Sequence, residues 1–339
     1  MARALGLYSV AQARALDSYA VAELGIPGYT LMRRAGEAAL RALRTRWPTA
    51  TRIAIVCGGG NNGGDGYVVG RYARAAGLDV SVLALIDPAQ LRGDALRAAD
   101  EYRASGGPVR PFAASLLGEA EVLVDALLGT GLTQPVRPEY AAAIAAMNGA
   151  ARPILALDLP SGLDGDTGQT HGCAVRADTT ITFVAPKTGL YLGVGPECAG
   201  RVLFDSLGIE APAGAQVDPV MERLDEADIA RALPRRARDA HKGNFGRVLL
   251  IGSAPGMAGA VRLAGEACLR CGAGLVTVAT APEHVAAIVA GRPELICHGV
   301  SDAEQLTVLL AAASVVAIGP GLGTGAWSRA LFDTAVACG

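Results

Sequence analysis

A glycine-rich segment at residues 58–66 carries the first chemistry that the sequence indicates. It reads Gly-Gly-Gly-Asn-Asn-Gly-Gly-Asp-Gly and follows a short β-branched run. Glycine lets the backbone take positive φ or approach a ligand closely, and a helix that follows offers free N–H groups to a phosphate. The G-x-G-x-x-G spacing fits the dinucleotide fingerprint, with Asp87 as a candidate ribose-binding acid. That fingerprint does not require the two asparagines or Asp65, and the simpler alternative is a tight strand-to-helix turn.

Two aspartates end neighbouring candidate strands. Asp125 closes the run Glu-Val-Leu-Val-Asp, and Asp158 closes Pro-Ile-Leu-Ala-Leu-Asp. In an open parallel sheet the ligand crevice lies beyond the carboxyl ends of the strands, so we expect both acids to face the region that residues 58–66 also reach. A strand-end aspartate sometimes serves only as the N-cap of the next helix. Because each acid precedes a glycine-containing loop, the pattern favours a binding site.

Oxygen donors collect in the same region. The Asn62 amide, the Asp125 carboxylate and the Ser161 hydroxyl suit a hard cation. The four histidines stand far apart in the sequence and none lies in these motifs, so a zinc site is not indicated. Lys187 follows the fifth candidate strand and is expected to face the crevice, the alternative being an exposed lysine before a turn.

Short β-branched runs alternate with longer Ala/Leu/Arg segments, the pattern of an α/β protein with a mostly parallel sheet. The expected strands are 52–57, 80–85, 121–125, 153–158, 179–184, 201–204, 248–252, 274–280 and 315–319. The expected helices are 9–24, 30–46, 66–76, 92–105, 136–147, 259–271, 282–289, 302–312 and 326–337, the first two opened by Ser9 and Thr30 as caps. We predict a first domain at 1–207, a linker at 208–220 rich in Gly, Ala and Pro, and a second domain at 221–339.

Composition excludes several classes of protein. The 339 residues include 32 acids and 30 bases, so the net charge is close to zero. This balance gives no indication of binding to nucleic acid or to an anionic membrane surface. Half of the residues (51%) are hydrophobic, yet the longest apolar stretch, 309–319, falls short of the roughly 18 residues that a membrane span needs. The N-terminus shows no continuous apolar segment of a signal peptide. Seven cysteines without a framework spacing predict a reduced, cytoplasmic protein.

The first 205 or so residues resemble the YjeF N-terminal family, the NAD(P)H-hydrate epimerase domain. The resemblance rests on four ordered motifs: GGGNNGGDG at 58–66, VDALLGTGL at 124–132, LDLPSGLDGDTG at 157–168 and TFVAPKTG at 182–189. It implies a Rossmann-like three-layer α/β fold and a K⁺ ion bound by Asn62, Asp125 and Ser161. It also implies that the substrate, NADHX or NADPHX, is bound by Asn61, Asn62, Gly63, Gly64, Asp65, Gly129, Thr130, Gly131, Leu132, Thr133, Gln134, Pro135, Tyr140 and Asp158.

The second half is similar to the ribokinase-like NAD(P)H-hydrate dehydratase, through residues 241–260, 268–280 and 319–323. This resemblance implies ADP as phosphoryl donor, with Mg²⁺ as a candidate companion, and hydrate binding near Ala260 and Gly323. Motifs that the family carries beyond the sequence GPGLG are not found before Gly339. We therefore expect a partial ribokinase-like α/β domain, an incomplete dehydratase without activity of its own.

The predicted function is nicotinamide nucleotide repair by epimerisation of the hydrate at C6. That reaction needs proton transfer and no redox step, so Asp158 is the first candidate for acid/base catalysis, with Lys187 setting its charge or relaying the proton. When the hydroxyl leaves, the ring becomes a cation. Two roles therefore stay open for Asp158, which either transfers a proton or stabilises this cation. The alternatives are an NAD-dependent oxidoreductase, for which no Tyr-x-x-x-Lys pair stands out, and a non-enzymatic binding scaffold. The two N-terminal helices are a candidate surface for a homo-oligomer.

Overall fold

The computed structural model describes residues 5–209 and 217–338, and the chain divides into two compact units, Met1–Leu233 and Pro234–Gly339. Within the expected linker at 208–220, residues 210–216 lie outside the described part. No helix in the described ranges is long and apolar enough to cross a membrane.

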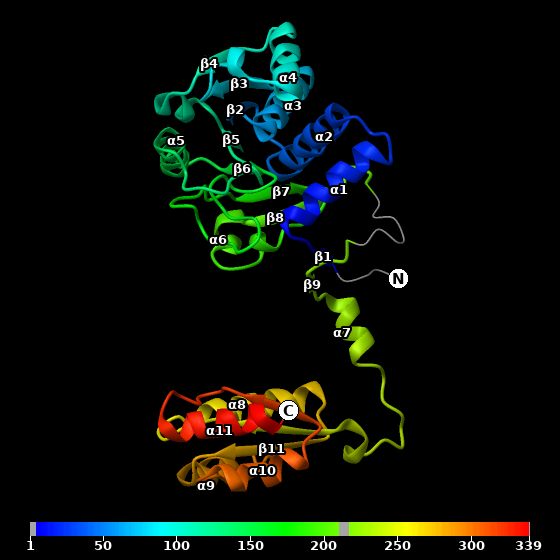
Figure 1. The fold of residues 1–339 in the computed structure, drawn as a ribbon, viewed down its shortest axis with the longest axis vertical. Helices are drawn as coiled ribbons and strands as arrows, with labels where there is room; N and C mark the ends of the chain where they lie inside the picture. The colour runs from blue at the N-terminus through cyan, green and yellow to red at the C-terminus, as the bar shows by residue number, and fades with distance from the viewer. Residues whose placement is uncertain (1–4, 210–216, 339) are drawn as a thin grey trace. The chain divides into compact units, whose positions relative to one another are not determined.

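A seven-stranded parallel sheet forms the centre of the first unit (Figure 1). Its strands in spatial order are β4 (Val109–Pro111), β3 (Asp79–Ala84), β2 (Arg52–Cys57), β5 (Val122–Ala126), β6 (Ile154–Leu157), β7 (Thr179–Phe183) and β8 (Arg201–Asp205). The chain winds outward from β2 in one direction and from β5 in the other. Such a reversal opens a crevice at the carboxyl ends of the two central strands.

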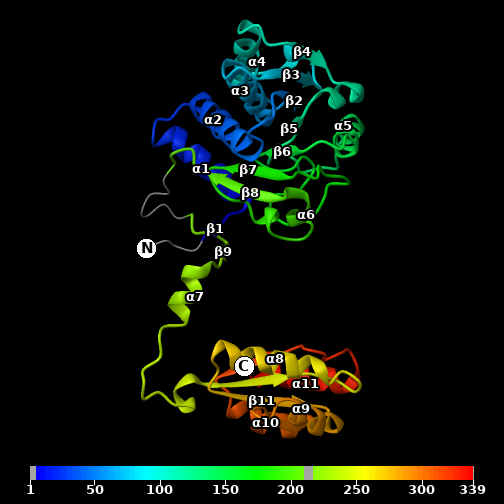
Figure 2. The ribbon, with the colours of Figure 1, turned by 180° about the vertical axis from the view of Figure 1, so that it is seen from behind.

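Helices cover both faces of this sheet, as Figure 1 and Figure 2 show from opposite sides. One face carries α1 (Val10–Ala22), α2 (Gly28–Arg46), α3 (Asn61–Ala75) and α4 (Gly93–Ala104), and the other carries α5 (Pro138–Gly149) with the short helix η2 (Ala114–Glu119). Strand side chains alternate between the two cores. In β5, for example, Val122 and Val124 pack toward α1–α4, whereas Leu123 packs toward α5.

Shorter elements complete the first unit. They are β1 (Leu5–Leu7), η1 (Pro88–Gln90), η3 (Thr188–Leu190), α6 (Gly195–Ala199), β9 (Met221–Arg223) and α7 (Glu226–Ala232). Strand β9 pairs antiparallel with β1. The division between the units therefore falls after Leu233, rather than at residue 221 where the sequence places the start of the second domain.

The second unit is a smaller three-layer α/β arrangement. Its parallel sheet has the order β12 (Ile296–Gly299), β11 (Leu275–Thr280), β10 (Arg247–Ile251) and β13 (Val315–Ile318). One face packs α8 (Gly259–Cys271) and α9 (Val285–Gly291), and the other packs α10 (Ala303–Ala311) and α11 (Ala326–Cys338). The turns η4 (Lys242–Phe245) and η5 (Pro282–His284) precede β10 and α9.

The predicted fold class, parallel α/β in both halves, is confirmed. Ser9 caps α1 as expected, in a capping box with Gln12. The expected cap Thr30 is wrong, because α2 begins at Gly28 after Pro27. Strand β12 is not among the strands expected from the sequence. It has only four residues and follows a polar segment, so no β-branched run marks it.

The start of α3 differs most from expectation. The helix begins at Asn61 instead of residue 66, so the Asn-Asn-Gly-Gly-Asp sequence is helical. Glycine has low intrinsic helix propensity, which favours a loop there. Packing overrides that preference: a Cβ on Gly64 would lie 2.7 Å from the Met32 side chain, so helix α3 approaches α2 closely through its glycines.

Candidate active site

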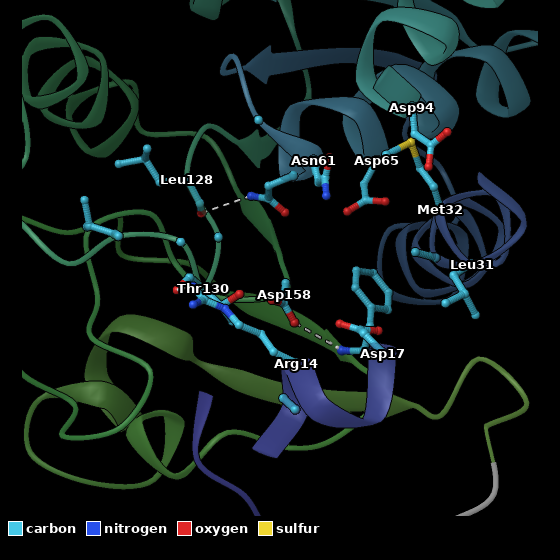
Figure 3. Close-up of a pocket in the computed structure, with 18 of the residues that line it drawn as sticks. Arg14, Asp17, Leu31, Met32, Asn61, Asp65, Asp94, Leu128, Thr130 and Asp158 are labelled. Carbon is cyan, nitrogen blue, oxygen red and sulfur yellow. Dashed lines mark hydrogen bonds between the residues drawn. The ribbon is translucent and has the colours of Figure 1, made fainter. Parts of the chain in front are cut away.

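A cavity of about 1250 Å³ lies beyond the carboxyl ends of β2, β5, β6 and β7, at the reversal of strand order. Loops after these strands form one part of its wall, and helices α1 and α2 form another (Figure 3). Its polar lining includes Arg14, Asp17, Asn61, Asn62, Asp65, Thr130, Arg137, Tyr140, Asp158 and Lys187. A cavity of this size at this place in the sheet suits a nucleotide-sized ligand.

Close backbone approach builds the start of α3 at the cavity wall. A Cβ on Gly58 would lie 2.0 Å from the Leu127 carbonyl oxygen, and a Cβ on Gly63 would lie 2.1 Å from that of Gly58. Only glycine permits this contact between the β2 and β5 loops. The N-cap, Gly60, offers no side-chain hydrogen bond to the first turn of the helix. The N–H groups of that turn therefore remain available to an anion.

A buried polar network stands behind the cavity. The Asp125 carboxylate, fully buried, accepts hydrogen bonds from the Ser161 hydroxyl at 2.6 Å, the Ser161 N–H at 2.8 Å and the Leu127 N–H at 3.2 Å. Asn62 donates from Nδ2 to the Leu128 carbonyl at 3.0 Å. Its Oδ1 is buried and has no hydrogen-bond partner within the described ranges. A buried acceptor without a protein partner usually marks the position of an ordered water or an ion.

The three expected cation ligands are thus all buried. Their donor atoms are amide, carboxylate and hydroxyl oxygens, which fit an alkali or alkaline-earth cation. No group of three or more His, Cys, Asp or Glu side chains able to hold a metal occurs among the residues that the structure describes. Burial raises the pKa of Asp125 to about 6, although its hydrogen bonds from Ser161 and Leu127 oppose this shift.

A buried ion pair faces the cavity from the next two strands. Lys187 is only 3% exposed, and its Nζ donates to an Asp158 carboxylate oxygen, to Thr182 Oγ1 at 3.2 Å and to the Phe183 carbonyl at 2.8 Å. All three N–H groups of the ammonium therefore have partners. Asp158 has φ +65°, a left-handed conformation that aspartate tolerates better than most residues. Backbone strain at a ligand cavity is typical of a functional residue.

Two further carboxylates line the same cavity. Burial raises the pKa of Asp65 well above its ordinary value, and the charges of Asp158 and Asp17 add to this effect. Desolvation also raises the pKa of Asp17, while the nearby Lys187 ammonium opposes the shift. Asp17 and Asp65 therefore retain protons at pH values where isolated aspartates would lose them.

Replacing Asp65 with asparagine should stabilise the protein at alkaline pH. Because the folded-state pKa is raised, Asp65 in the unfolded chain ionises at lower pH, and the native state loses stability as pH rises above the ordinary value. The Asp65→Asn variant lacks this loss. Its midpoint of thermal unfolding should exceed that of the unaltered chain at about pH 8, with a smaller difference at about pH 4. An equal difference at both pH values would contradict the raised pKa.

The expected site residues of the first unit fall into four groups in the structure. Those that line the cavity are Asn61, Asn62, Asp65, Gly129, Thr130, Gly131, Leu132, Tyr140, Asp158 and Lys187. Asp125 and Ser161 lie behind it, Gly63 and Gly64 allow close packing of α3 against the β2 loop and α2, and Thr133, Gln134 and Pro135 are outside its lining. Asp87, the candidate ribose-binding acid, instead accepts the Ala89 N–H as the cap of η1.

The remaining two expected residues belong to the second unit. The loop after β10 meets the GPGLG segment, since Ser253 and Ala254 donate N–H bonds to the Pro320 and Gly321 carbonyls at 2.8 Å each. Ala260 lies against Gly321, where an added Cβ would be 2.8 Å from its side chain. Gly323 has φ +69° in the same segment. Ala260, in the first turn of α8, and Gly323, in the loop after β13, thus belong to adjoining segments of one unit.

Helix α1 supplies two site residues that the sequence did not indicate. Asp17 lines the cavity, and Arg14 donates from Nη2 to the Thr130 carbonyl at 2.7 Å. Both lie beside the buried stripe Ala13, Leu16 and Ala20. A charged residue next to an apolar stripe is the usual pattern of a surface helix, so the sequence gave little signal for them.

Comparison with known proteins places the two units in families. Residues 28–189 match the model described as YjeF-related protein N-terminus, and residues 248–337 match that described as NAD(P)H-hydrate dehydratase. The chain is 50% identical over 327 residues to the bifunctional NAD(P)H-hydrate repair enzyme Nnr of Coxiella burnetii, covering 96% of this chain and 67% of that protein. This chain belongs to the bifunctional NAD(P)H-hydrate repair enzyme family.

Another member of the repair enzyme family, Nnr of Escherichia coli K12, is 42% identical over 306 residues, which cover 90% of this chain and 59% of the relative. The chain thus spans about three fifths to two thirds of the length of these curated relatives. The crystal structure of the yeast protein ynu0 (YNL200c) matches with a TM-score of 0.53 at 19% identity, covering 65% of this chain and all of that one. This last likeness concerns the fold alone.

Proposed function

We propose that the first unit interconverts the R and S forms of NAD(P)H hydrate. The observation that carries the proposal is the buried Asp158–Lys187 ion pair at the wall of a nucleotide-sized cavity. The names of the Coxiella and Escherichia relatives support this substrate, since both are described as NAD(P)H-hydrate repair enzymes. The expected cytoplasmic location and homo-oligomer remain predictions.

The chemistry follows from the hydrate itself. Its C6 hydroxyl is next to the ring nitrogen, so protonation of the hydroxyl lets water leave while the nitrogen lone pair forms a C=N bond. Water then returns to the opposite face of C6 and gives up a proton. Lys187 donates a hydrogen bond to the Asp158 carboxylate, a group suited both to stabilise the cationic ring and to accept that proton.

The rest of the cavity would orient the nucleotide. The N–H groups at the start of α3 suit the phosphates, and the Gly129–Leu132 loop with Tyr140 would hold the remainder of the molecule. Asn62, Asp125 and Ser161 fit a K⁺ ion, because Asn62 Oδ1 is buried without a partner beside two further oxygen donors. Such an ion would supply fixed positive charge close to the loops that bind phosphate.

Epimerase turnover tests this proposal directly. Purified R-form NADPH hydrate would be incubated with the chain and an external dehydratase specific for the S form, and NADPH formation would be followed. Turnover above the spontaneous rate of interconversion supports the epimerase. No acceleration by folded protein in the presence of K⁺ would contradict it and favour a binding scaffold.

Potassium should stabilise the unaltered chain against thermal unfolding more than lithium at equal ionic strength. A cation that binds the native state alone raises the unfolding midpoint by mass action, about 2.7 kcal/mol at a hundredfold excess over Kd. The Asn62→Ala variant lacks the orphaned acceptor and should lose the difference between the two salts. A difference that persists in this variant would exclude Asn62 as a ligand.

We further propose that the second unit takes part in dehydration of the S form, which departs from the expectation above that it has no activity of its own. Its match to the dehydratase family at residues 248–337 supports this proposal. The start of α8 with Ala260 and the adjoining loop with Gly323 would contact the hydrate. A requirement for ADP, with Mg²⁺, is tested in the same assay by omitting the coupling dehydratase and adding both. NADPH formed from the S form under those conditions would support this activity, and none would count against it.

A further inference from the structure

Helix α1 is fixed against the very segment that carries Lys187. Tyr8, just before the helix, donates its N–H to the Pro186 carbonyl at 2.8 Å and accepts the Thr188 N–H at 3.0 Å. The first residue of α1, Val10, donates its N–H to Asp166 at 2.6 Å. The start of α1 is therefore held by backbone on both sides of Lys187, so side chains two turns along the helix have a defined place in the cavity.

Asp17 occupies such a place. It lines the cavity, and Figure 3 shows it projecting from α1 near Asp158. Lys187 exerts the largest charge effect on Asp17, and Asp158 the next. No hydrogen bond to the Asp17 carboxylate occurs within the described parts of the chain. Asp17 and Asp158 thus line the cavity from two different elements, helix α1 and the end of β6, and the charge of Lys187 acts on Asp17.

The same cavity wall contains an independent sign of a missing ligand. Asn62, more than nine-tenths buried, presents an Oδ1 without a partner. Its neighbours at the wall include the free N–H groups of the first α3 turn. Asp17 is exposed, but it lines the same cavity as Asp158, and the partnerless Asn62 Oδ1 in the wall indicates that this cavity takes a ligand.

Epimerisation requires proton transfer on two faces of one ring. The hydroxyl must be protonated on the face from which it leaves, and the returning water must be deprotonated on the opposite face. One carboxylate cannot reach both faces of a bound ring. In the reverse direction the two roles exchange, so the site needs two similar groups that share one proton.

We propose that Asp17 is a second proton-transfer residue, serving the ring face opposite to that served by Asp158. This inference rests on the proposed epimerase function. In one direction the Asp17 carboxyl proton goes to the C6 hydroxyl, the C6–O bond breaks, and its electron pair leaves with water. The nitrogen lone pair forms the C=N bond, water adds on the other face, the π pair returns to nitrogen, and Asp158 takes the released proton.

The starting state is then restored by exchange with solvent. Asp17, which is exposed, takes a proton from water and Asp158 returns one, so protons balance and no oxidant or reductant is needed. The electrostatics support this state, since desolvation raises the pKa of Asp17 above its ordinary value. The charged groups that act on Asp17 are Lys187 and Asp158. Asp65 on α3 lines the same cavity, and the charge of Asp17 raises its pKa.

The decisive experiment measures epimerisation and oxygen exchange separately. The full chain and the Asp17→Asn and Asp158→Asn variants would be incubated with each purified form of NADPH hydrate in oxygen-18 water. We expect each variant to lose epimerisation by about 100-fold or more. A remaining carboxylate still serves its own face, so each variant should catalyse oxygen exchange with retained configuration for one form only. The favoured form should be opposite in the two variants.

A matched control is Glu23→Gln, which removes a carboxylate from the exposed end of α1, outside the cavity lining. It should epimerise like the unaltered chain. If the unaltered chain does not accelerate interconversion, the proposed function fails and this inference with it. If it does, normal epimerisation by Asp17→Asn overturns the inference alone. If Asp17→Asn loses oxygen exchange equally for both forms, the role of Asp17 is merely structural or electrostatic. If epimerisation is instead lost in Asp65→Asn alone, the second proton-transfer residue is Asp65 on α3.

Discussion

Substituting Asp158 by asparagine should lower the rate of hydrate epimerisation by about 100-fold or more while the protein stays folded. Asparagine keeps the shape of the side chain and tolerates the φ of +65° at this position. Alanine should abolish turnover equally, but it adds about 1 kcal/mol of strain in the left-handed region. The loss arises because a neutral amide neither accepts a proton at neutral pH nor balances the positive charge that develops on the ring.

The measurement is the initial rate of conversion of the R form, coupled to a dehydratase specific for the S form. Thermal unfolding of the same sample checks the fold. Asp100→Asn provides the matched control, because Asp100 is an exposed aspartate on α4 that does not line the cavity. A rate for Asp158→Asn equal to that of the control would remove Asp158 from the proton-transfer role.

The position of Asp158 could be predicted because parallel α/β sheets reveal their strands locally. Short β-branched runs bounded by glycine gave β2 at its observed bounds and β5, β6 and β7 to within a residue or two. Because the ligand crevice of an open parallel sheet lies beyond the carboxyl ends of its strands, strand-end residues can be placed together without knowledge of the packing. Asp158 and Lys187 meet for this reason, although they stand 29 residues apart.

Asp125 shows where that rule is too coarse. It too comes at the end of a strand, yet it is fully buried and does not line the cavity. Alternation along β5 explains this difference, since Asp125 shares the face of Leu123 and points away from the α1–α4 side. There it meets the Ser161 hydroxyl and N–H from the next loop. The chain order of motifs does not reveal such a meeting, because it depends on the path of a loop.

The contribution of α1 could not be predicted from its own residues. A helix that covers a sheet shows its buried stripe in the sequence, but the sequence does not say what lies next to that stripe. Tyr8 and Asp166 determine where α1 begins, and both contacts join segments more than 150 residues apart. Asp17 becomes a site residue only through those contacts.

Substituting Gly63 by alanine should destabilise the first unit by about 3 kcal/mol or more, the upper range for overpacking. The new Cβ would lie 2.1 Å from the Gly58 carbonyl oxygen and 2.9 Å from its carbon. These are backbone atoms, so relief requires α3 to move away from the β2 loop. That movement would also separate the Asn62 amide from the Leu128 carbonyl, which it contacts at 3.0 Å. Cation-dependent stabilisation should therefore be lost together with stability.

Gly60 offers a control in the same loop, since an added Cβ there meets nothing within 4 Å and its φ of −105° suits any residue. Gly60→Ala should change the free energy of unfolding by no more than ~1 kcal/mol, the effect of a poorer N-cap. Urea unfolding in a Trp327→Phe background would isolate the first unit, because the remaining tryptophan, Trp47, lies there. Equal unfolding midpoints for Gly60→Ala and Gly63→Ala would show that α3 does not depend on close approach at Gly63. A loss of stability confined to Gly63→Ala would establish that glycine is required at this position for α3 to pack against the β2 loop, independently of any bound ligand.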